Sequence, residues 1–333
     1  MSTENKIQTF RQTWDQLRAE IGRVMVGADS IVEGSLTAIF AGGHVLLEGV
    51  PGLGKTLLVR TLSEVLDLSF NRIQFTPDLM PSDILGTNLV VENPDGRREF
   101  QFQRGPIFAH IILADEINRA TPKTQSAMLE AMQEKQVTAA GEIRRLAEPF
   151  FVLATQNPID QEGTYPLPEA QLDRFFFKLL VGYPTAAELT EVINRTTEGH
   201  KPELKKVIDG AGLMDLQKLV REVPVATHVK DYAVRLVLAT HPKTDTAVPI
   251  SNQYLRFGSS PRGAQSLILA GKVRALSQGR FNVSFEDIQA VAPATLRHRL
   301  ILNFEAEAEG ITTDLIIAHV LNDVPKNPET VKV

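Results

Sequence analysis

Short apolar runs alternate with stretches of helical periodicity along the first half of the chain, up to about residue 183. The runs that we predict as strands cover residues 45–48, 72–75, 111–115, 151–155 and 175–181. Such alternation is typical of a parallel sheet with helical crossovers. The nearly continuous hydrophobicity of each run indicates strands that are buried on both faces. The pattern therefore predicts an α/β domain.

Two shorter pairs of apolar runs predict β-hairpins inserted into this domain. Residues 89–91 and 98–103 flank Asn93-Pro94-Asp95-Gly96, in which Asp-Gly is a strong turn signal. Residues 137–138 and 143–146 flank a weaker Ala-Gly turn.

From residue 184 onward the hydrophobic period becomes that of a helix. The predicted helices cover residues 213–220, 232–240, 264–276 and 285–296, and Ser260-Pro261 and Ser284-x-x-Asp287 mark two helix starts. We therefore predict two domains, an α/β core over residues 1–183 and an all-helical domain over residues 184–333. The last residues, 326–333, are expected to be disordered.

Residues 49–56 form a complete phosphate-binding loop, Gly49-Val50-Pro51-Gly52-Leu53-Gly54-Lys55-Thr56, between a predicted strand and a helical run that begins at Leu57. This strand–loop–helix context is what the G-x-x-x-x-G-K-[ST] pattern requires. The glycines let backbone N–H groups turn toward a β-phosphate. Lys55 can reach the β- and γ-phosphates, and the Thr56 hydroxyl can bind Mg²⁺. A turn that only joins strand to helix is the alternative, which this context disfavours, so residues 49–57 are predicted to bind a nucleoside triphosphate.

Two acidic residues, Asp115 and Glu116, end the predicted strand at residues 111–115. Ligands of parallel sheets bind at the carboxyl ends of the strands, which predicts that Asp115 lies beside the phosphate loop. There its carboxylate can hold Mg²⁺ through water, and Glu116 can orient and deprotonate an attacking water. The alternative is that the pair only caps a strand, and the upstream Lys55-Thr56 argues against it.

The strand predicted at residues 151–155 is followed by Gln156-Asn157-Pro158. The amide of Asn157 can hydrogen-bond a γ-phosphate or the attacking water. Asn-Pro is also a common turn dipeptide, so both interpretations of Asn157 stay open here.

Composition narrows the protein class. The 333 residues include no cysteine and carry a net charge of -5. Disulfides and thiolate metal sites are therefore excluded, and no global basic field attracts nucleic acid. The histidines lack metal-ligand spacing. We expect a soluble cytoplasmic protein, because the N-terminus has no signal-peptide core and the apolar runs are shorter than a membrane span.

Four segments carry a specific resemblance: LLEGVPG at residues 46–52, DEINRA at 115–120, ATQNP at 154–158 and PEAQLDRF at 168–175. They resemble the MoxR family of AAA+ ATPases, and the similarity runs in order from about Val26 to Arg297-His298-Arg299. The resemblance implies an AAA+ core with a parallel sheet in the order 5-1-4-3-2, followed by a helical lid. The two hairpins look like the helix-2 and pre-sensor-1 insertions of that clade.

The resemblance also implies roles for single residues. Lys55 and Thr56 match Walker A, Asp115 and Glu116 match Walker B, Asn157 matches sensor 1, and Val26 and Gly27 match the segment that lies against the adenine. Arg174 looks like an arginine finger offered to a neighbouring subunit's γ-phosphate, and Arg262 looks like sensor 2 on the lid. From the residues alone, a surface arginine paired with Asp173 is the favoured interpretation of Arg174, which the resemblance reverses. Arg256 is a nearby alternative to Arg262 for the sensor-2 role.

The expected function is ATP hydrolysis with Mg²⁺ in a ring, a hexamer by the family resemblance, that remodels a protein partner. The family further implies a von Willebrand factor A-domain protein as partner. A nucleotide-gated scaffold is an alternative, which Glu116 argues against because a pure switch does not need that carboxylate. A DNA translocase or helicase shares the same core, and the acidic balance argues against it.

Overall fold

A five-stranded parallel sheet forms the centre of the computed structural model, which describes residues 2–157, 164–197 and 202–327. Its strands are β1 (Val45–Glu48), β2 (Phe70–Gln74), β5 (Ile111–Asp115), β8 (Phe151–Gln156) and β9 (Phe177–Leu180). They lie in the order β2-β5-β8-β1-β9, and all neighbours run parallel. Numbered along the chain, this is the order 5-1-4-3-2, so the predicted AAA+ sheet is confirmed.

The last strand begins two residues later than the predicted run at residues 175–181. A short helix, α6 (Glu169–Leu172), and the turn after it carry the chain to Phe175, and pairing with β1 begins at Phe177. Phe175 and Phe176, which the pattern assigned to the strand, are still buried, Phe175 in one hydrophobic core and Phe176 in another.

Alternate residues of β1, β5 and β8 enter two different hydrophobic cores. Val45, Leu47 and Leu113 belong to one core, whereas Leu46 and Ile112 belong to the other. This two-residue period is that of a pleated strand with both faces covered. The predicted burial of the strands on both faces is confirmed for β1, β5 and β8, in which only the last residue is partly exposed.

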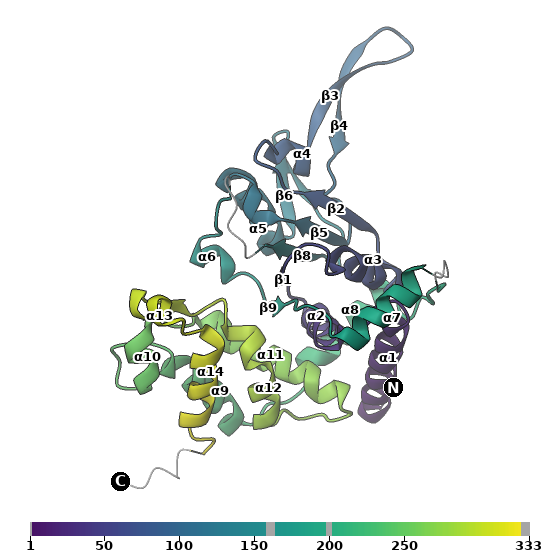
Figure 1. Cartoon of the computed structure of the whole chain (residues 1–333). Coiled ribbons are helices and arrows are strands. Elements are labelled where there is room, and N and C mark those ends of the chain that lie inside the picture. Colours follow the sequence, from purple (N-terminus) through teal and green to yellow (C-terminus); the bar gives the residue numbers. More distant parts are fainter. Residues whose placement is uncertain (1, 158–163, 198–201, 328–333) are drawn as a thin grey trace.

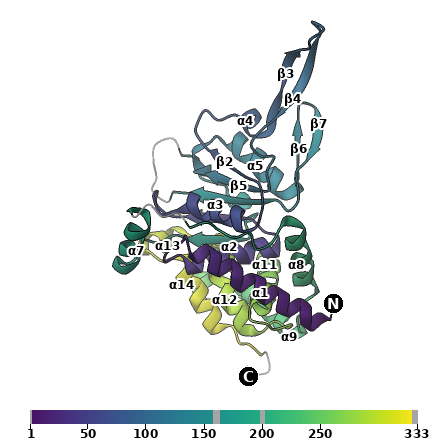
Figure 2. The ribbon, with the colours of Figure 1, turned by 90° about the vertical axis from the view of Figure 1, so that its right-hand side faces the viewer.

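Helices cover both faces of the sheet (Figures 1 and 2). On one face lie α1 (Thr3–Gly22), α2 (Asp29–Ala41) and α3 (Lys55–Val65), and their core continues into the C-terminal helices. On the other face lie α4 (Pro81–Leu85) and α5 (Pro122–Glu134), with the 3-10 turn η1 (Ile117–Arg119) between sheet and α5. The sheet is therefore packed on both faces, and the last residues of β1, β5 and β8 at its carboxyl-terminal edge are partly exposed.

Both predicted hairpins are present. Strands β3 (Gly86–Glu92) and β4 (Arg98–Arg104) project far from the body, and β6 (Gln136–Ala139) and β7 (Glu142–Arg145) lie beside their base (Figures 1 and 2). The guanidinium of Arg144 stacks 3.6 Å from the centroid of the Phe102 ring and so ties the two hairpins together.

The C-terminal region is helical, as predicted. Its helices are α7 (Ala186–Thr197), α8 (Gly210–Glu222), α9 (Thr227–Ala239), α10 (Pro249–Tyr254), α11 (Pro261–Ser277), α12 (Phe285–Leu296), α13 (Phe304–Glu309) and α14 (Thr313–Asp323). Ser284 and Asp287 form the predicted capping box of α12, and Ser260 caps α11. The structure adds a short antiparallel pair, β10 (Leu255–Phe257) and β11 (Ile301–Leu302), which is too short to produce a periodic signal.

The division of the chain at residues 183 and 184 stays a prediction, because α8 beyond it packs against α2 before it. Of the segment 326–333 that we expected to be disordered, residues 328–333 lie outside the described residues. In the part of the chain that the structure covers, every helix is too short or too polar to cross a membrane.

Candidate nucleotide-binding site

The phosphate loop connects the end of β1 to the start of α3, as its sequence context predicts. Gly54 caps α3 in the left-handed conformation, with φ at 77°, which favours glycine. At Gly49 a Cβ atom would lie 2.6 Å from the carbonyl oxygen of Val181, so a side chain cannot fit there. The loop can therefore hold its backbone close to β9 and turn its N–H groups toward an anion at the N-terminus of α3.

Lys55, the first residue of α3, points its ammonium group back into the loop, where it donates to the carbonyl oxygen of Gly49. Burial lowers the pKa of Lys55, and the nearby carboxylates of Asp115, Glu116 and Glu48 oppose that shift. A partly buried cation thus faces three acids at the edge of the sheet, an arrangement that a bound triphosphate would complete.

Asp115 ends β5 and is held by two neighbouring strands. Its Oδ2 accepts hydrogen bonds from Arg72 Nε at 3.0 Å and Nη2 at 2.7 Å, and its Oδ1 accepts one from Thr155 Oγ1 at 2.6 Å. Arg72 lies on β2 and Thr155 on β8, on either side of β5. The carboxylate is therefore oriented from both sides.

Glu116 follows directly in the left-handed region, with φ at 56°, which is uncommon for a residue with a side chain. Its backbone N–H donates to Thr155 Oγ1 at 2.8 Å. Its Oε2 accepts hydrogen bonds from Gln74 Nε2 at 3.0 Å and Arg119 Nη1 at 2.9 Å. The sharp turn separates the two acids, so that Asp115 and Glu116 have different partners.

Sequence reasoning missed Arg72, Gln74 and Thr155. Arg72 and Gln74 alternate with the buried Ile73 and so share one face of β2. The sequence pattern could have predicted that these two polar side chains lie on the same face. The sequence does not reveal that this face meets Asp115 and Glu116, because that depends on which strand lies next to β5.

Asn157 directly follows β8 and thus lies at the same edge of the sheet as the end of β5. The residue after it lies outside the described residues, so the structure leaves both interpretations of Asn157 open.

A cavity of about 700 Å³ adjoins the phosphate loop. Its walls come from residues 24–28, from Gly52, Leu53, Gly54 and Leu57 of the loop and α3, from residues 180–184 after β9, and from α7. Val26 and Gly27, which the family resemblance assigns to the adenine, therefore lie beside the loop. Sequence reasoning missed the α7 wall, since we predicted no helix there.

Arg195 fixes the α7 wall in place. Its Nη1 donates to the carbonyl oxygens of Gly22 and Arg23 at 3.0 Å each, and its Nε pairs with Glu191 at 2.6 Å. These contacts join α7 to the end of α1 across the cavity. A cavity that is mostly apolar, with the phosphate loop at one end, suits a nucleoside.

Arg174 is half-buried after α6, and among the described residues no carboxylate lies within 4.0 Å of its guanidinium. The pairing with Asp173 that we considered is not formed. Asp173 instead accepts hydrogen bonds from Ser260, Arg262 and Arg299. The positive charge of Arg174 is thus available to an external anion.

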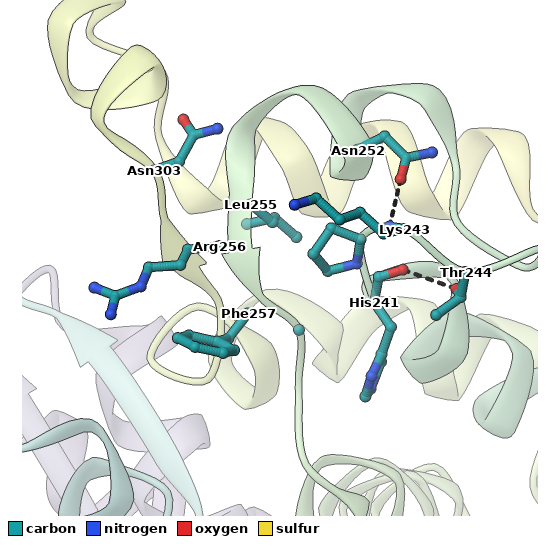
Figure 3. A pocket seen from close by; sticks show the side chains of 10 residues that line it. His241, Lys243, Thr244, Asn252, Leu255, Arg256, Phe257 and Asn303 are labelled. Atoms are coloured by element: carbon teal, nitrogen blue, oxygen red, sulfur yellow. Dashed lines mark hydrogen bonds between the residues drawn. The ribbon is translucent and has the colours of Figure 1, made fainter.

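Arg262 and Arg256 occupy different places. Arg262 is the second residue of α11, and its Nη1 lies 3.3 Å from Asp173 Oδ2, next to Arg174. Arg256 lies on β10 with its guanidinium 5.2 Å from the centroid of the Phe257 ring. It lines a separate cavity of about 460 Å³ in the lid, together with Lys243 and Asn303 (Figure 3). Only Arg262 therefore shares a cluster with the Arg174 turn.

The donor set fits Mg²⁺. Thr56 and Asp115 offer hard oxygen ligands, and groups of three or more His, Cys, Asp or Glu side chains that could hold a metal are absent from the described residues. Mg²⁺ does not need such a cage, because it retains waters and binds through one or two protein ligands together with substrate phosphates.

Comparisons with known proteins agree with this geometry. The model of the ATPase family associated with various cellular activities (AAA) matches residues 44–177, and that of the AAA lid domain matches residues 249–320. The chain is 45% identical to Chaperone MoxR1 of Mycobacterium tuberculosis, over 92% of this chain and 80% of that protein. It is 30% identical to Protein MoxR of Methylorubrum extorquens, over 95% and 96% of the two chains. A crystal structure from Cytophaga hutchinsonii superposes with a TM-score of 0.90 at 42% identity and covers 97% of both chains.

Proposed function

The chain belongs to the MoxR family of AAA+ ATPases, and from this premise we propose that it hydrolyses ATP with Mg²⁺ in a cytoplasmic ring, a hexamer, that remodels a protein partner. The observation that carries the proposal is the convergence of Lys55, Asp115 and Glu116 at one edge of the sheet, beside a cavity of nucleoside size. Membership of the family supports nucleotide binding in general.

Each part of the site has a task in this proposal. The loop N–H groups and Lys55 bind the β- and γ-phosphates, and Val26 and Gly27 contact the base. Thr56 and Asp115 hold Mg²⁺, which when bound neutralises charge that develops on the phosphate oxygens. Thr155 and Arg72 orient the Asp115 carboxylate, as their hydrogen bonds of 2.6 to 3.0 Å support. Asn157 hydrogen-bonds the γ-phosphate or the attacking water.

Glu116 is the general base in this scheme. It accepts a proton from the water that attacks the γ-phosphate in line, while Lys55 stabilises the charge that passes to the leaving oxygen. Its Oε1 accepts no hydrogen bond from described residues, whereas Oε2 accepts two. One carboxylate oxygen is thus available to a water without breaking an existing contact.

The ring part of the proposal rests on Arg174. Its half-buried guanidinium has lost part of its hydration and has no carboxylate partner in the described part of the chain. A γ-phosphate from a neighbouring subunit would compensate for that loss with charged hydrogen bonds. Arg262 on the lid serves as sensor 2 and reports whether the subunit's own γ-phosphate is present.

A protein partner, with a von Willebrand factor A-domain protein as the family expectation, fits the surface of the β3–β4 hairpin. Val90 and Phe100 lie opposite each other on its strands and are 59% and 76% exposed. Exposed apolar patches of this kind mark protein contacts more readily than nucleic-acid contacts, which need basic surfaces. The name of the Mycobacterium relative, Chaperone MoxR1, supports the remodelling part.

Substitution of Glu116 by Gln tests the proposal. The amide keeps the size and the hydrogen bonding of the side chain but cannot take a proton, so we expect retained ATP binding, lost turnover and an oligomer trapped in its ATP form. Phosphate release and sedimentation with and without ATP measure these effects. Glu64→Gln, on the exposed face of α3, is the matched control. Parental turnover in Glu116→Gln would contradict the catalytic-base role and favour a scaffold that does not need hydrolysis.

A further inference from the structure

The Asp173 carboxylate joins the arginine-finger turn to the lid. Its two oxygens accept hydrogen bonds from Ser260 Oγ at 2.8 and 2.9 Å, from Arg299 Nε at 3.0 Å and from Arg262 Nη1 at 3.3 Å. Ser260 and Arg262 begin α11, and Arg299 follows α12. One carboxylate, next to Arg174 in the chain, therefore binds three lid residues.

The backbone on both sides of Arg174 is fixed by the same cluster. Arg299 is buried, and besides Asp173 it donates from Nη2 to the Phe175 carbonyl oxygen at 2.7 Å and from Nη1 to that of Phe176 at 3.3 Å. The buried His298 lies with Nε2 3.0 Å from the Phe175 carbonyl oxygen. Movement of the lid at these residues must therefore move the base of the Arg174 side chain.

Of the three lid residues that bind Asp173, Arg262 is the one that a nucleotide can most easily draw away. The Arg299 side chain is only 2% exposed, whereas that of Arg262 is 46% exposed and has the longest of the hydrogen bonds. A γ-phosphate offers Arg262 a stronger anion than a carboxylate that already accepts from Ser260 and Arg299. Asp173 and a γ-phosphate therefore compete for the same guanidinium.

We propose that Asp173 is a positioning residue that couples the nucleotide of one subunit to the arginine finger which that subunit offers to its neighbour. The inference rests on the proposed roles of Arg174 and Arg262. Without a γ-phosphate, Asp173 holds Arg262. With a γ-phosphate, Arg262 leaves Asp173 and the lid shifts toward the nucleotide; because Ser260 and Arg299 keep the lid joined to the turn, this shift moves Arg174 toward the neighbouring site.

Substitution of Asp173 by Asn tests the competition. The amide oxygen still accepts from Ser260 and Arg299, but the charge that holds Arg262 is gone. We expect the affinity for ATP relative to ADP to rise about two- to fivefold, as for a partly exposed ion pair. The Hill coefficient of ATP hydrolysis should fall toward 1, because neighbouring sites lose their coupling. In the Arg262→Ala background the same substitution should leave the ATP-to-ADP affinity ratio unchanged.

Asp314→Asn is the matched control. Asp314 pairs with Arg297 through two hydrogen bonds of 2.9 and 2.8 Å, and Arg297 also donates to the Lys178 carbonyl oxygen of β9, so this pair joins lid and core without contact to Arg262. We expect no change in nucleotide preference or Hill coefficient. An equal effect of Asp314→Asn would overturn the proposal, since any loosened lid would then suffice.

Two outcomes separate this inference from the proposed function. If Arg262→Ala reduces the preference for ATP and Asp173→Asn does not alter it, the coupling role fails and the sensor-2 role stands. If Arg262→Ala has no effect either, both fail. Should Asp173→Asn not fold, hydrogen exchange of the amides of residues 172–176 in Arg174→Ala protein gives a second test. Exchange there should differ between a non-hydrolysable ATP analogue and ADP, and equal exchange would overturn the coupling.

Discussion

Gln74 on β2 donates a hydrogen bond from its side-chain amide to the carboxylate of Glu116, over 3.0 Å and across the edge of the sheet. The same amide accepts through Oε1 from Arg72 Nη2 at 2.5 Å, and Arg72 binds Asp115. A single line of hydrogen bonds on β2 therefore links the proposed metal ligand to the proposed base. The orientation of Glu116 depends on these hydrogen bonds, because Gln74 and Arg119 are the two described donors that hold its Oε2.

Substitution of Gln74 by Ala should lower the turnover number. Glu116 loses one of the two donors that hold its carboxylate in place, and one hydrogen bond of about 1 kcal/mol corresponds to a loss of about fivefold. ATP affinity should not change, since Gln74 has no role in phosphate binding. Steady-state kinetics together with nucleotide titration measure both quantities.

Gln133→Ala is the control for this prediction, because Gln133 is an exposed glutamine on α5 whose amide donates to the neighbouring Glu134. Parental turnover for Gln74→Ala at unchanged affinity would contradict the expected loss and show that Gln74 does not position Glu116.

Nucleotide binding should depend on Lys55. Truncation to Ala leaves the charge of the β- and γ-phosphates partly uncompensated in a site where three acids already lie close to that position. We expect ATP binding to fall below detection by calorimetry, with the circular dichroism spectrum of the parent. Lys206→Ala, which removes a surface lysine paired with Asp67, should bind as the parent does. Parental affinity in Lys55→Ala would mean that the loop is only structural.

The sequence allowed prediction of the sheet and of the residues at its edge for one physical reason. Strands buried on both faces must be apolar throughout, so a polar residue such as Asp115 at the end of a run identifies the carboxyl edge where ligands bind. The lid helices α8, α9, α11 and α12 could also be predicted from the sequence, since each presents one apolar stripe to the core.

Other parts were not predicted, for different reasons. α2 is apolar on almost every side and has no helical period, because it is covered both by the sheet and by the lid. α1 does carry an apolar stripe at helical spacing, formed by Phe10, Trp14, Leu17 and Ile21. This helix could therefore have been predicted from the sequence, although we did not predict it. The partners of Asp173 come from segments about 90 and 126 residues away, and local pattern cannot reveal such pairs.

Stability should fall as the pH decreases from 6.5 toward 4, because His44 is buried and neutral. Its Nδ1 accepts from the Val152 N–H at 3.0 Å, and its Nε2 lies 3.0 Å from the Met132 carbonyl oxygen. Burial lowers the pKa of His44 to about 4, below the ordinary value of 6.5. In this window the unfolded chain binds the extra proton, so each such histidine costs about 1.4 kcal/mol of unfolding free energy per pH unit.

Denaturant unfolding at several pH values measures this slope. Burial also lowers the pKa of His298, which adds in the same direction. His44→Asn keeps an acceptor near the position of Nδ1 but cannot titrate, and its slope should be smaller by about 1.4 kcal/mol per pH unit. An unchanged slope in His44→Asn would show that His44 is not the titrating group.

Catalysis should be shared between subunits through Arg174. A guanidinium that stabilises charge on the γ-phosphate in the transition state is worth about 10³–10⁵ in rate, or about 4–7 kcal/mol of barrier. Arg174→Ala should therefore bind ATP normally and be inactive. Mixing it with Lys55→Ala should restore activity, because an intact Arg174 from the Lys55 variant then meets an intact phosphate loop from the Arg174 variant. Mixed rings, detected by a mass tag on one variant, that stay inactive would place Arg174 outside the neighbouring site.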